Sequence, residues 1–505
     1  MATPPVLVVG AGPSGLALAL RLTMQGLPVR IVERRAGPGE ASRATVVHAR
    51  TLELYRQMGF GDEVVARGIV AEALLLREDE ETVARFDFGD LGRGLSPYPF
   101  VLCYPQDDHE RFLVERLTAA GVKVEWETEL TAFEETEGGV RATLTKGGRE
   151  EMATFAYLAG CDGAHSTVRH GLGIDFPGGT YDQLFYVADA TLTGGQRREV
   201  GVKIQTDAFA LLFPVRRTGA QRIVGNVPPE FTGRDDLTFE EIRPVAESLA
   251  GDRVEAIHWF TTYRVHHRVA AHFRVGRVFL CGDAGHIHSP AGGQGMNTGI
   301  GDAINLAWKL ADVLEGRADD SILDTYETER LAFARTLVAT TDRVFTTLIG
   351  HGLESHLVRD VLLPHVLPFV AGFTPVRRAA FAAVSQTSLH YGASALSEGH
   401  AGHVEGGDRL PWVPYGEGDN FAPLTSLGWQ VHVYGETKPA LREAVDTLDL
   451  PLHLFPFSDE AETAGLAWNA AYLVRPDGYV ALASPGGDAT TLHHYVERHG
   501  LRFGS

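Results

Sequence analysis

The chain has 505 residues, of which 44% are hydrophobic and 22% are charged. These proportions are ordinary for globular proteins and exclude a wholly disordered, collagen-like or coiled-coil chain. Lys and Arg total 45 against 65 Asp and Glu, a formal net charge of −20, which disfavours general nucleic-acid binding because that binding needs cations to neutralise phosphates. The sequence shows no secretory signal and no apolar run of membrane-spanning length, so we expect a cytoplasmic protein without nucleic-acid or membrane partners.

Three consecutive patterns indicate an N-terminal βαβ unit. Val6–Gly10 is a short apolar run of the kind that forms buried parallel strands, Ser14–Gln25 carries leucines at helical spacing, and Val29–Glu33 has the pattern of a second strand. We expect a right-handed crossover that leaves the two strands parallel.

Helices and strands are mixed up to residue 160. Two helices are predicted, at Arg50–Met58 and Asp107–Ala120. Residue alternation predicts antiparallel strands, followed by one short buried strand, at Val122–Trp126, Leu130–Glu134, Val140–Thr145 and Tyr157–Gly160.

Between about residues 176 and 270, strand-like segments separated by Gly and Pro predict a mostly antiparallel inserted sheet. Its clearest strands are Phe185–Thr193, Phe209–Pro214 and Arg222–Val227. Val278–Cys281 returns to the buried-strand pattern. Helices are predicted at Gly301–Leu314 and Asp324–Val344, and across residues 345–385.

Gly, Pro and Asp accumulate over residues 392–420 and predict an irregular entry to a third domain. Beyond it, Pro476-Asp-Gly478 between two apolar runs predicts a hairpin. The other predicted strands and helices of this domain are Trp429–Tyr434, Lys438–Thr447, Leu452–Phe455, Ala471–Val474, Tyr479–Ala483 and Thr490–His499.

Gly10-Ala-Gly-Pro-Ser-Gly15 is the G-x-G-x-x-G sequence of a dinucleotide-binding turn, in the required strand–turn–helix context. Gly10 permits the tight turn, Gly12 lets the backbone approach a pyrophosphate, and Gly15 lets the helix pack on the strand. Glu33 can accept hydrogen bonds from both ribose hydroxyls and would repel a 2′-phosphate, which favours FAD or NAD at this turn. The alternative is an ordinary glycine turn.

Two further motifs follow buried strands. Gly282-Asp-Ala-Gly-His286 precedes Pro290-Ala-Gly-Gly-Gln-Gly-Met-Asn297, whose small residues let backbone amides approach a flat ligand, while Asp283 can hold a polyol chain. The third motif begins with Cys161-Asp-Gly163 and ends at Arg169. Taken alone, the second is also compatible with a glycine-rich loop or a helix cap, and the third with a turn. The three cysteines, Cys103, Cys161 and Cys281, form neither a disulfide framework nor a metal-ligand spacing.

In this order, the three motifs resemble those of the class A flavoprotein monooxygenases, the aromatic hydroxylases that bind FAD and use NAD(P)H. The run from Gly276 to Leu314 resembles the branch that contains phenol hydroxylases and polyketide or antibiotic hydroxylases. That branch ends in a thioredoxin-like domain with a strand pattern similar to Tyr472-Leu-Val-Arg-Pro-Asp-Gly-Tyr-Val-Ala481. The resemblance covers nearly the whole chain.

The resemblance implies an α/β fold with four parts. We expect a Rossmann-like FAD-binding domain in residues 1–175 and 271–345, and a mostly antiparallel substrate-binding sheet in 176–270. A helical connection follows in 346–395, and a thioredoxin-like domain without C-x-x-C occupies 396–505. Because no cysteine follows Cys281, the last domain cannot perform dithiol chemistry, so it is structural or serves an interface.

The resemblance also implies cofactor-binding residues, carried over position by position. The nucleotide half of FAD would be held at Gly10, Gly12, Ser14, Gly15, Glu33, Arg34, Arg43, Gln106 and Leu130. The DG motif, implicated in both FAD and NAD(P)H binding, corresponds to Asp162 and Arg169. The ribityl chain and the isoalloxazine would be held at Asp283, Pro290, Gly295, Met296 and Asn297.

The implied reaction is hydroxylation of a phenolic or polycyclic polyketide-like ring. NADPH or NADH reduces FAD transiently, O2 adds to form a C4a-hydroperoxyflavin, and its distal oxygen is transferred to the ring. Phe213, His258 and Tyr263 are candidates for lining the pocket, with core packing as the alternative for each, and His286 is expected to be a packing residue. No residue is assigned to deprotonating the substrate, no metal is expected, and the chain is expected to be a monomer or homodimer.

Four other functions are considered. An NAD-dependent dehydrogenase would explain the first motif but neither of the others. A flavin-dependent halogenase typically has a W-x-W-x-I-P segment, which this sequence lacks. A Baeyer–Villiger or epoxidising enzyme of the same branch and a non-catalytic flavin-binding protein both remain open.

Overall fold

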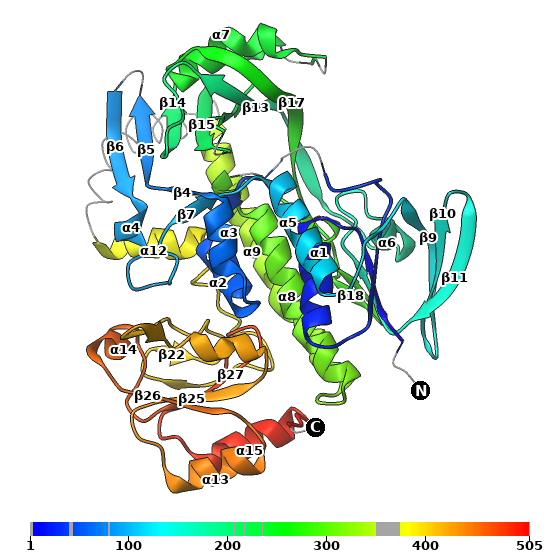
Figure 1. Cartoon of the computed structure of the whole chain (residues 1–505), viewed down its shortest axis with the longest axis vertical. Helices are drawn as coiled ribbons and strands as arrows, with labels where there is room; N and C mark the ends of the chain where they lie inside the picture. Colours follow the sequence, from blue (N-terminus) through cyan, green and yellow to red (C-terminus); the bar gives the residue numbers. More distant parts are fainter. Residues whose placement is uncertain are drawn as a thin grey trace.

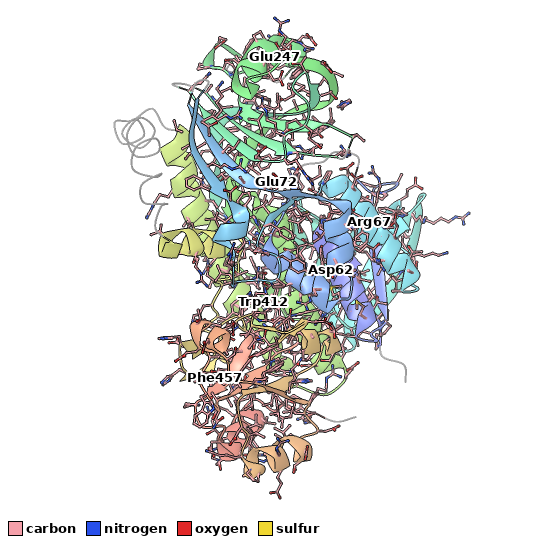
Figure 2. All side chains as sticks on the ribbon, turned by 60° about the vertical axis from the view of Figure 1, so that its left-hand side comes forward. Asp62, Arg67, Glu72, Glu247, Trp412 and Phe457 are labelled. Carbon is pink, nitrogen blue, oxygen red and sulfur yellow. The ribbon has the colours of Figure 1, made fainter. Side chains whose placement is uncertain are left out.

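The computed structural model describes residues 4–39, 44–78, 81–205, 208–216, 218–231, 233–234, 236–289, 291–349 and 374–503. Figure 1 shows three regions along the long axis of the molecule: a sheet topped by a helix at one end, a central α/β region, and a C-terminal sheet with its own helices at the other. Figure 2 shows the same order from another side, from Glu247 at one end to Phe457 near the other.

The central region contains a six-stranded sheet in the order β18-β19-β12-β1-β2-β8. Four parallel strands form its core: β1 (Val6–Val9), β2 (Val29–Glu33), β12 (Leu158–Gly160) and β19 (Val278–Leu280). β18 (Arg274–Val275) pairs antiparallel to β19 at one edge. At the other edge, β8 (Glu125–Trp126) pairs parallel to β2, so the antiparallel pairing predicted for Val122–Trp126 is wrong. Pairing with an already buried strand prevails over local alternation.

Helices α1 (Pro13–Met24), α5 (Gln106–Ala119) and α8 (Gly295–Leu314) pack together in this region. α8 begins at Gly295, six residues before the predicted start at Gly301. The glycines in its first turns lower helix propensity, but they allow close packing against neighbouring segments, which favours the helix here. α9 (Asp324–Ile349) and α12 (Thr374–Val384) agree with the helical prediction at its two ends, and residues 350–373 lie outside the described residues. Within the described part of the chain, no helix combines the length and apolarity needed to cross a bilayer.

Two small three-stranded sheets flank the centre. β9 (Thr128–Thr136), β10 (Gly139–Lys146) and β11 (Arg149–Phe155) are antiparallel, as predicted for the first two. β3 (Val46–Val47), β7 (Val101–Cys103) and β4 (Ile69–Ala71) form the other. The nearby helices, of which only the first was predicted, are α2 (Ala49–Gln57), α3 (Gly61–Arg67), α4 (Phe88–Leu91) and α6 (Thr167–Gly171).

An eight-stranded, mostly antiparallel sheet forms one end of the molecule, in the order β20-β17-β13-β16-β15-β14-β5-β6. Most strands come from the predicted insertion: β13 (Gly178–Leu192), β14 (Val200–Ile204), β15 (Phe209–Pro214), β16 (Gln221–Asn226) and β17 (Val254–Val269). The others are β5 (Ala73–Glu78), β6 (Glu81–Asp87) and β20 (His286–Ile287), which lie outside residues 176–270. Helix α7 (Phe239–Ala250), which was not predicted, covers the outer face.

The C-terminal sheet has the order β22-β21-β28-β27-β25-β26. The four strands predicted for this domain are confirmed within one residue: β25 (Gln430–Tyr434), β26 (Leu452–Phe455), β27 (Ala471–Val474) and β28 (Val480–Ser484). The remaining elements are β21 (Glu398–Ala401), β22 (Val404–Glu405), β23 (Pro414–Tyr415), β24 (Gly418–Asp419), α13 (Pro439–Thr447), α14 (Asp459–Thr463) and α15 (Ala489–Arg498).

Three fully buried histidines make the stability of this fold sensitive to mild acid. Burial lowers the pKa of His48 to about 4 and the pKa values of His109 and His432 to about 3. Because the unfolded chain takes up protons near pH 6.5 and the folded chain does not, stability is complete above that pH and declines as the pH falls toward 4. Each histidine costs about 1–2 kcal/mol at pH 5.

We therefore expect the Tm of the wild type, measured by circular dichroism, to fall substantially between pH 7 and pH 5. His432→Gln removes one titrating group and should give a smaller fall. Equal Tm values at the two pH values in the wild type would contradict this account.

Candidate functional site

The glycine turn between β1 and α1 is held close to β12. At Gly10, where φ is +103°, a Cβ would lie 2.3 Å from the carbonyl oxygen of Cys161. At Gly15 a Cβ would lie 2.0 Å from the Gly10 oxygen, so α1 packs tightly against the turn. At Gly12, by contrast, a Cβ would meet no atom within 4 Å. Gly12 therefore faces open space at the helix N-terminus, where a pyrophosphate can approach.

Glu33 lies at the carboxyl end of β2, beside this turn. Its carboxylate accepts hydrogen bonds from the Ala11 N–H (2.9 Å), the Arg35 N–H (3.0 Å) and the Arg35 guanidinium (3.2 Å). Burial alone would raise the pKa of Glu33, but these hydrogen bonds outweigh it and leave the pKa lowered. Glu33 is thus an oriented anion that still has acceptor capacity. Arg34 and Arg35 are both exposed, but the hydrogen bonds to Glu33 come from Arg35, which was not among the predicted residues.

The Gly282–Ala284 turn, called here the GD turn, meets both α1 and α8. A Cβ at Gly282 would lie 2.5 Å from Ser14 Oγ, and one at Gly299 of α8 would lie 2.3 Å from the same oxygen and 3.1 Å from the Cα of Gly282. Asp283 is exposed at the tip of this turn. The first and second motifs are therefore in direct contact.

The DG motif follows β12, between the other two motifs in the sheet. Asp162 Oδ2 accepts the Val168 N–H at 3.1 Å, while Oδ1 is buried without a hydrogen-bond partner. Burial raises the pKa of Asp162, although hydrogen bonds from Ser166 and Val168 oppose the shift. Arg169 is buried, donates to the carbonyls of Ala284 (3.0 Å) and Ala164 (2.9 Å), and so joins the DG motif to the GD turn.

Helix α8 points its N-terminus toward this junction. Its first hydrogen bond runs from the Thr298 N–H to the Gln294 carbonyl at 2.8 Å, so the amides of Gly295, Met296 and Asn297 precede it and carry the positive end of the helix dipole. The Asn297 side chain donates to the Val46 and Gly293 carbonyls and accepts from the His48 N–H and the Thr51 hydroxyl. These four bonds use its full capacity, so only its backbone is open to a ligand.

Four other predicted cofactor residues have different outcomes. Gln106 Oε1 accepts the Ala44 N–H at 3.2 Å, and its amide donates to Glu110, so Gln106 holds the end of the segment that leads to β3. Leu130 is buried in β9 opposite Leu144. Arg43 and Pro290 lie outside the described residues.

A buried ionic group behind the GD turn was not predicted. Asp302 of α8 accepts the Gly282 N–H (3.0 Å), His286 Nε2 (2.7 Å) and Arg330 Nε (2.6 Å). Burial would raise the pKa of Asp302, but Arg330 and His286 lower it to about 2. His286 is a buried side chain whose ring is hydrogen-bonded to Asp302. Asp302 and Arg330 lie 28 residues apart on separate helices, so no sequence motif indicates that they pair.

The inner face of the eight-stranded sheet is mostly apolar and partly open, and it carries one buried ion pair, between Arg222 and Asp189. Its register aligns one row across four strands: Thr261, Val187, Val224 and Leu211. Thr261, Val224 and Leu211 stay half-exposed, whereas the opposite face is buried under α7. Neighbouring rows supply aromatic rings, including Phe213 and Tyr263.

The three predicted pocket residues do not all gather on that face. Phe213 packs against the apolar cluster that includes Val46, and a Cβ at Gly293 would lie 2.9 Å from Val46, so this cluster borders the loop before α8. Tyr263 packs against Phe185 with ring centroids 6.0 Å apart. His258 is exposed, hydrogen-bonded to Thr191, and five residues from Tyr263 along β17, about 16 Å by strand rise.

Comparison with known proteins agrees with this architecture. A family model described as FAD binding domain matches residues 3–341, and one described as aromatic-ring hydroxylase, C-terminal, matches residues 403–499. The chain is 35% identical to 6-methylpretetramide 4-monooxygenase of Streptomyces rimosus over 523 aligned positions, which cover 97% of this chain and 92% of that protein.

Solved structures give the same result. The flavin-dependent monooxygenase PieE in complex with FAD and substrate has a TM-score of 0.80 at 25% identity, covering 98% of each chain. A ternary complex of aklavinone-11 hydroxylase with FAD and aklavinone has a TM-score of 0.78 at 26% identity, covering 99% of each chain. The predicted α/β class, with a Rossmann-like FAD-binding domain, an inserted sheet and a thioredoxin-like C-terminal domain, is confirmed. The chain belongs to the FAD-dependent aromatic-ring monooxygenases.

Proposed function

We propose that this protein hydroxylates a polycyclic aromatic, polyketide-like substrate with O2, using FAD and NADPH or NADH. The observation that carries the substrate class is the partly open, mostly apolar face of the eight-stranded sheet. Phe213 on this face packs against an apolar cluster that includes Val46, and Val46 lies beside Gly293 in the loop before α8. A flat aromatic ligand buries apolar area there while its reacting carbon reaches toward the α8 N-terminus.

The residues at the junction of the three motifs fit FAD. We propose that the pyrophosphate lies against Gly12 and the α1 N-terminus, because this is the open position of an otherwise closely packed turn. Glu33, oriented by Arg35, would accept the ribose hydroxyls. The unpartnered oxygen of Asp162 and the exposed carboxylate of Asp283 would accept further hydroxyls of the cofactor.

When bound, FAD supplies the redox chemistry that takes electrons from NAD(P)H and activates O2. The amides of residues 295–297, with the dipole of α8, would stabilise negative charge beside the isoalloxazine. The apolar sheet face would exclude water from the reacting oxygen. We also propose that Asp162 and Arg169 contact the nicotinamide when NAD(P)H binds transiently. The division of the chain into the four expected domains is part of the same proposal.

The state of the chain as monomer or homodimer, its cytoplasmic location and its lack of nucleic-acid and membrane partners remain predictions. Hydroxylation is preferred over Baeyer–Villiger or epoxidising chemistry because the relative and the neighbour named above are a 4-monooxygenase and an 11-hydroxylase.

The activity is tested with polycyclic phenols and quinones under ¹⁸O2. We expect slow NAD(P)H oxidation alone, marked acceleration by the right aromatic compound, and a product that carries one ¹⁸O as a ring hydroxyl by NMR. Incorporation as an ester or epoxide oxygen would support the alternative chemistries, and NAD(P)H oxidation that no aromatic compound changes would support flavin binding without hydroxylation.

A matched glycine pair tests the FAD site. Gly12→Ala adds a methyl group into open space and should leave the Tm of the apoprotein unchanged, yet raise the Kd for FAD about ten- to a hundredfold by displacing the pyrophosphate. Gly15→Ala forces a methyl group against a backbone oxygen and should lower both apoprotein Tm and FAD affinity. Unchanged FAD binding in Gly12→Ala, measured by flavin fluorescence titration, would place the cofactor elsewhere.

Thr261→Trp tests the substrate face. An indole in the middle of the half-exposed row should raise the KM for the aromatic substrate about tenfold or more while FAD content stays at the wild-type level. The readouts are steady-state kinetics and the flavin absorbance of the purified protein. If the KM stays unchanged, the substrate does not bind on this face.

A further inference from the structure

The hairpin turn Arg475–Gly478, between β27 and β28, leaves the C-terminal sheet and enters the FAD-binding domain. Arg475 and Asp477 are buried, at 0% and 3% exposure. The turn contacts four helices of that domain. Arg21 Nη2 of α1 donates to the Pro476 carbonyl (2.8 Å), and Arg50 Nη2 of α2 donates to the Asp477 carbonyl (2.5 Å). Trp308 Nε1 of α8 donates to Asp477 Oδ2 (3.0 Å), and Arg475 pairs with Glu329 of α9.

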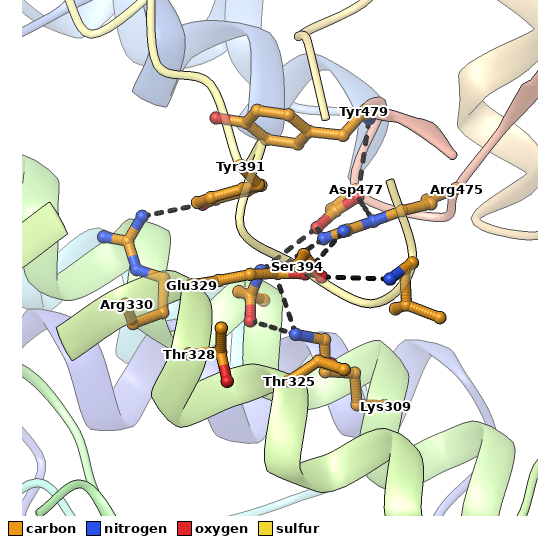
Figure 3. A network of polar contacts seen from close by, with 12 residues as sticks. Lys309, Thr325, Thr328, Glu329, Arg330, Tyr391, Ser394, Arg475, Asp477 and Tyr479 are labelled. Carbon is orange, nitrogen blue, oxygen red and sulfur yellow. Dashed lines mark hydrogen bonds and ion pairs between the residues drawn. The ribbon is translucent and has the colours of Figure 1, made fainter. Parts of the chain in front are cut away.

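Glu329 is the centre of this contact (Figure 3). Its two oxygens accept from Arg475 Nη1 and Nη2 at 2.8 and 3.0 Å. It also accepts from Lys309 (2.9 Å), Asn305 (2.6 Å) and Ser394 (2.7 Å). Burial would raise the pKa of Glu329, but Arg475 and Lys309 hold it far below its usual range. Glu329 is therefore an ionised carboxylate whose position is set by cations from both domains.

The next residue on α9 reaches the cofactor site. Arg330 Nε donates to Asp302 at 2.6 Å, and Nη2 donates to the Thr298 carbonyl in the first turn of α8 at 3.1 Å. The other oxygen of Asp302 accepts the Gly282 N–H of the GD turn at 3.0 Å. Two adjacent residues of one helix thus join the hairpin turn to both segments proposed to hold the ribityl chain and the isoalloxazine.

We propose that Arg475 and Asp477 are positioning residues for the flavin site: by fixing Glu329 and its neighbour Arg330, the C-terminal hairpin holds the GD turn and the α8 N-terminus in their FAD-binding geometry. The inference rests on the proposed FAD function. It makes the C-terminal domain part of the cofactor site, since its removal would leave Glu329 and Lys309 buried with an incomplete set of partners.

The test compares Arg475 with an interdomain ion pair that does not lead to the flavin site. Arg56 of α2 pairs with Asp419 of β24 at 2.6 Å, which provides the control variant Asp419→Asn. The variants are Arg475→Gln, the conservative Arg475→Lys, and Asp477→Asn, a milder change should Arg475→Gln not fold. For each full-length apoprotein, the Tm and the Kd for FAD are measured, together with the visible absorption spectrum of the bound flavin.

We expect Arg475→Gln and Asp477→Asn to raise the Kd for FAD about three- to thirtyfold and to alter the flavin spectrum, with partial recovery in Arg475→Lys. Asp419→Asn should lower the Tm without changing either flavin readout. A Kd in Asp477→Asn or Arg475→Gln that matches the wild type, or that changes no more than in Asp419→Asn at a similar loss of Tm, would overturn the positioning role. A wild type that does not bind FAD would instead refute the proposed function.

Discussion

The close approach of three backbone segments at the carboxyl edge of the central sheet is the constraint on which the site depends. Ser14 of α1 lies between Gly282 of the GD turn and Gly299 of α8. A Cβ added at either glycine would lie closer to the Ser14 hydroxyl oxygen than van der Waals contact allows, at 2.5 Å for Gly282 and 2.3 Å for Gly299. Because strands β1, β12 and β19 are parallel neighbours, their loops meet at one edge. This edge can then offer amides and carboxylates together to one elongated ligand.

Charge buried behind this edge gives it a defined geometry. Asp302, His286 and Arg330 lie under the GD turn, while Glu329, which precedes Arg330 on α9, pairs with Lys309 and Arg475. Buried ions cost desolvation free energy and are strongly destabilising when one partner is lost. Such a group tolerates few arrangements, so it specifies how α8, α9 and the C-terminal hairpin fit together more than it adds net stability.

The two faces of the eight-stranded sheet differ in burial. Side chains of one parity, such as Ile223 and Ala188, are buried under α7, whereas those of the other parity, such as Val224 and Thr261, remain half-exposed. The ion pair between Arg222 and Asp189, at 2.7 Å, lies in the next row of this face, between Phe213 and Trp259. An apolar face left uncovered within a well-packed chain is typical of a binding surface for an apolar ligand.

The sequence by itself determined the motif chemistry and most local elements. Gly10, Gly12 and Gly15 follow a strand with strong β-branched character, and the four strands predicted for the C-terminal domain were found within one residue, because local propensity and turn chemistry agree there with the fold. Only the tertiary structure decided the parallel pairing of β8, the early start of α8 and the addition of β5 and β6 to the eight-stranded sheet. It also decided that Arg475 reaches Glu329, 146 positions away. Such pairings depend on contacts between distant segments, whose free energy does not appear in any local window of sequence.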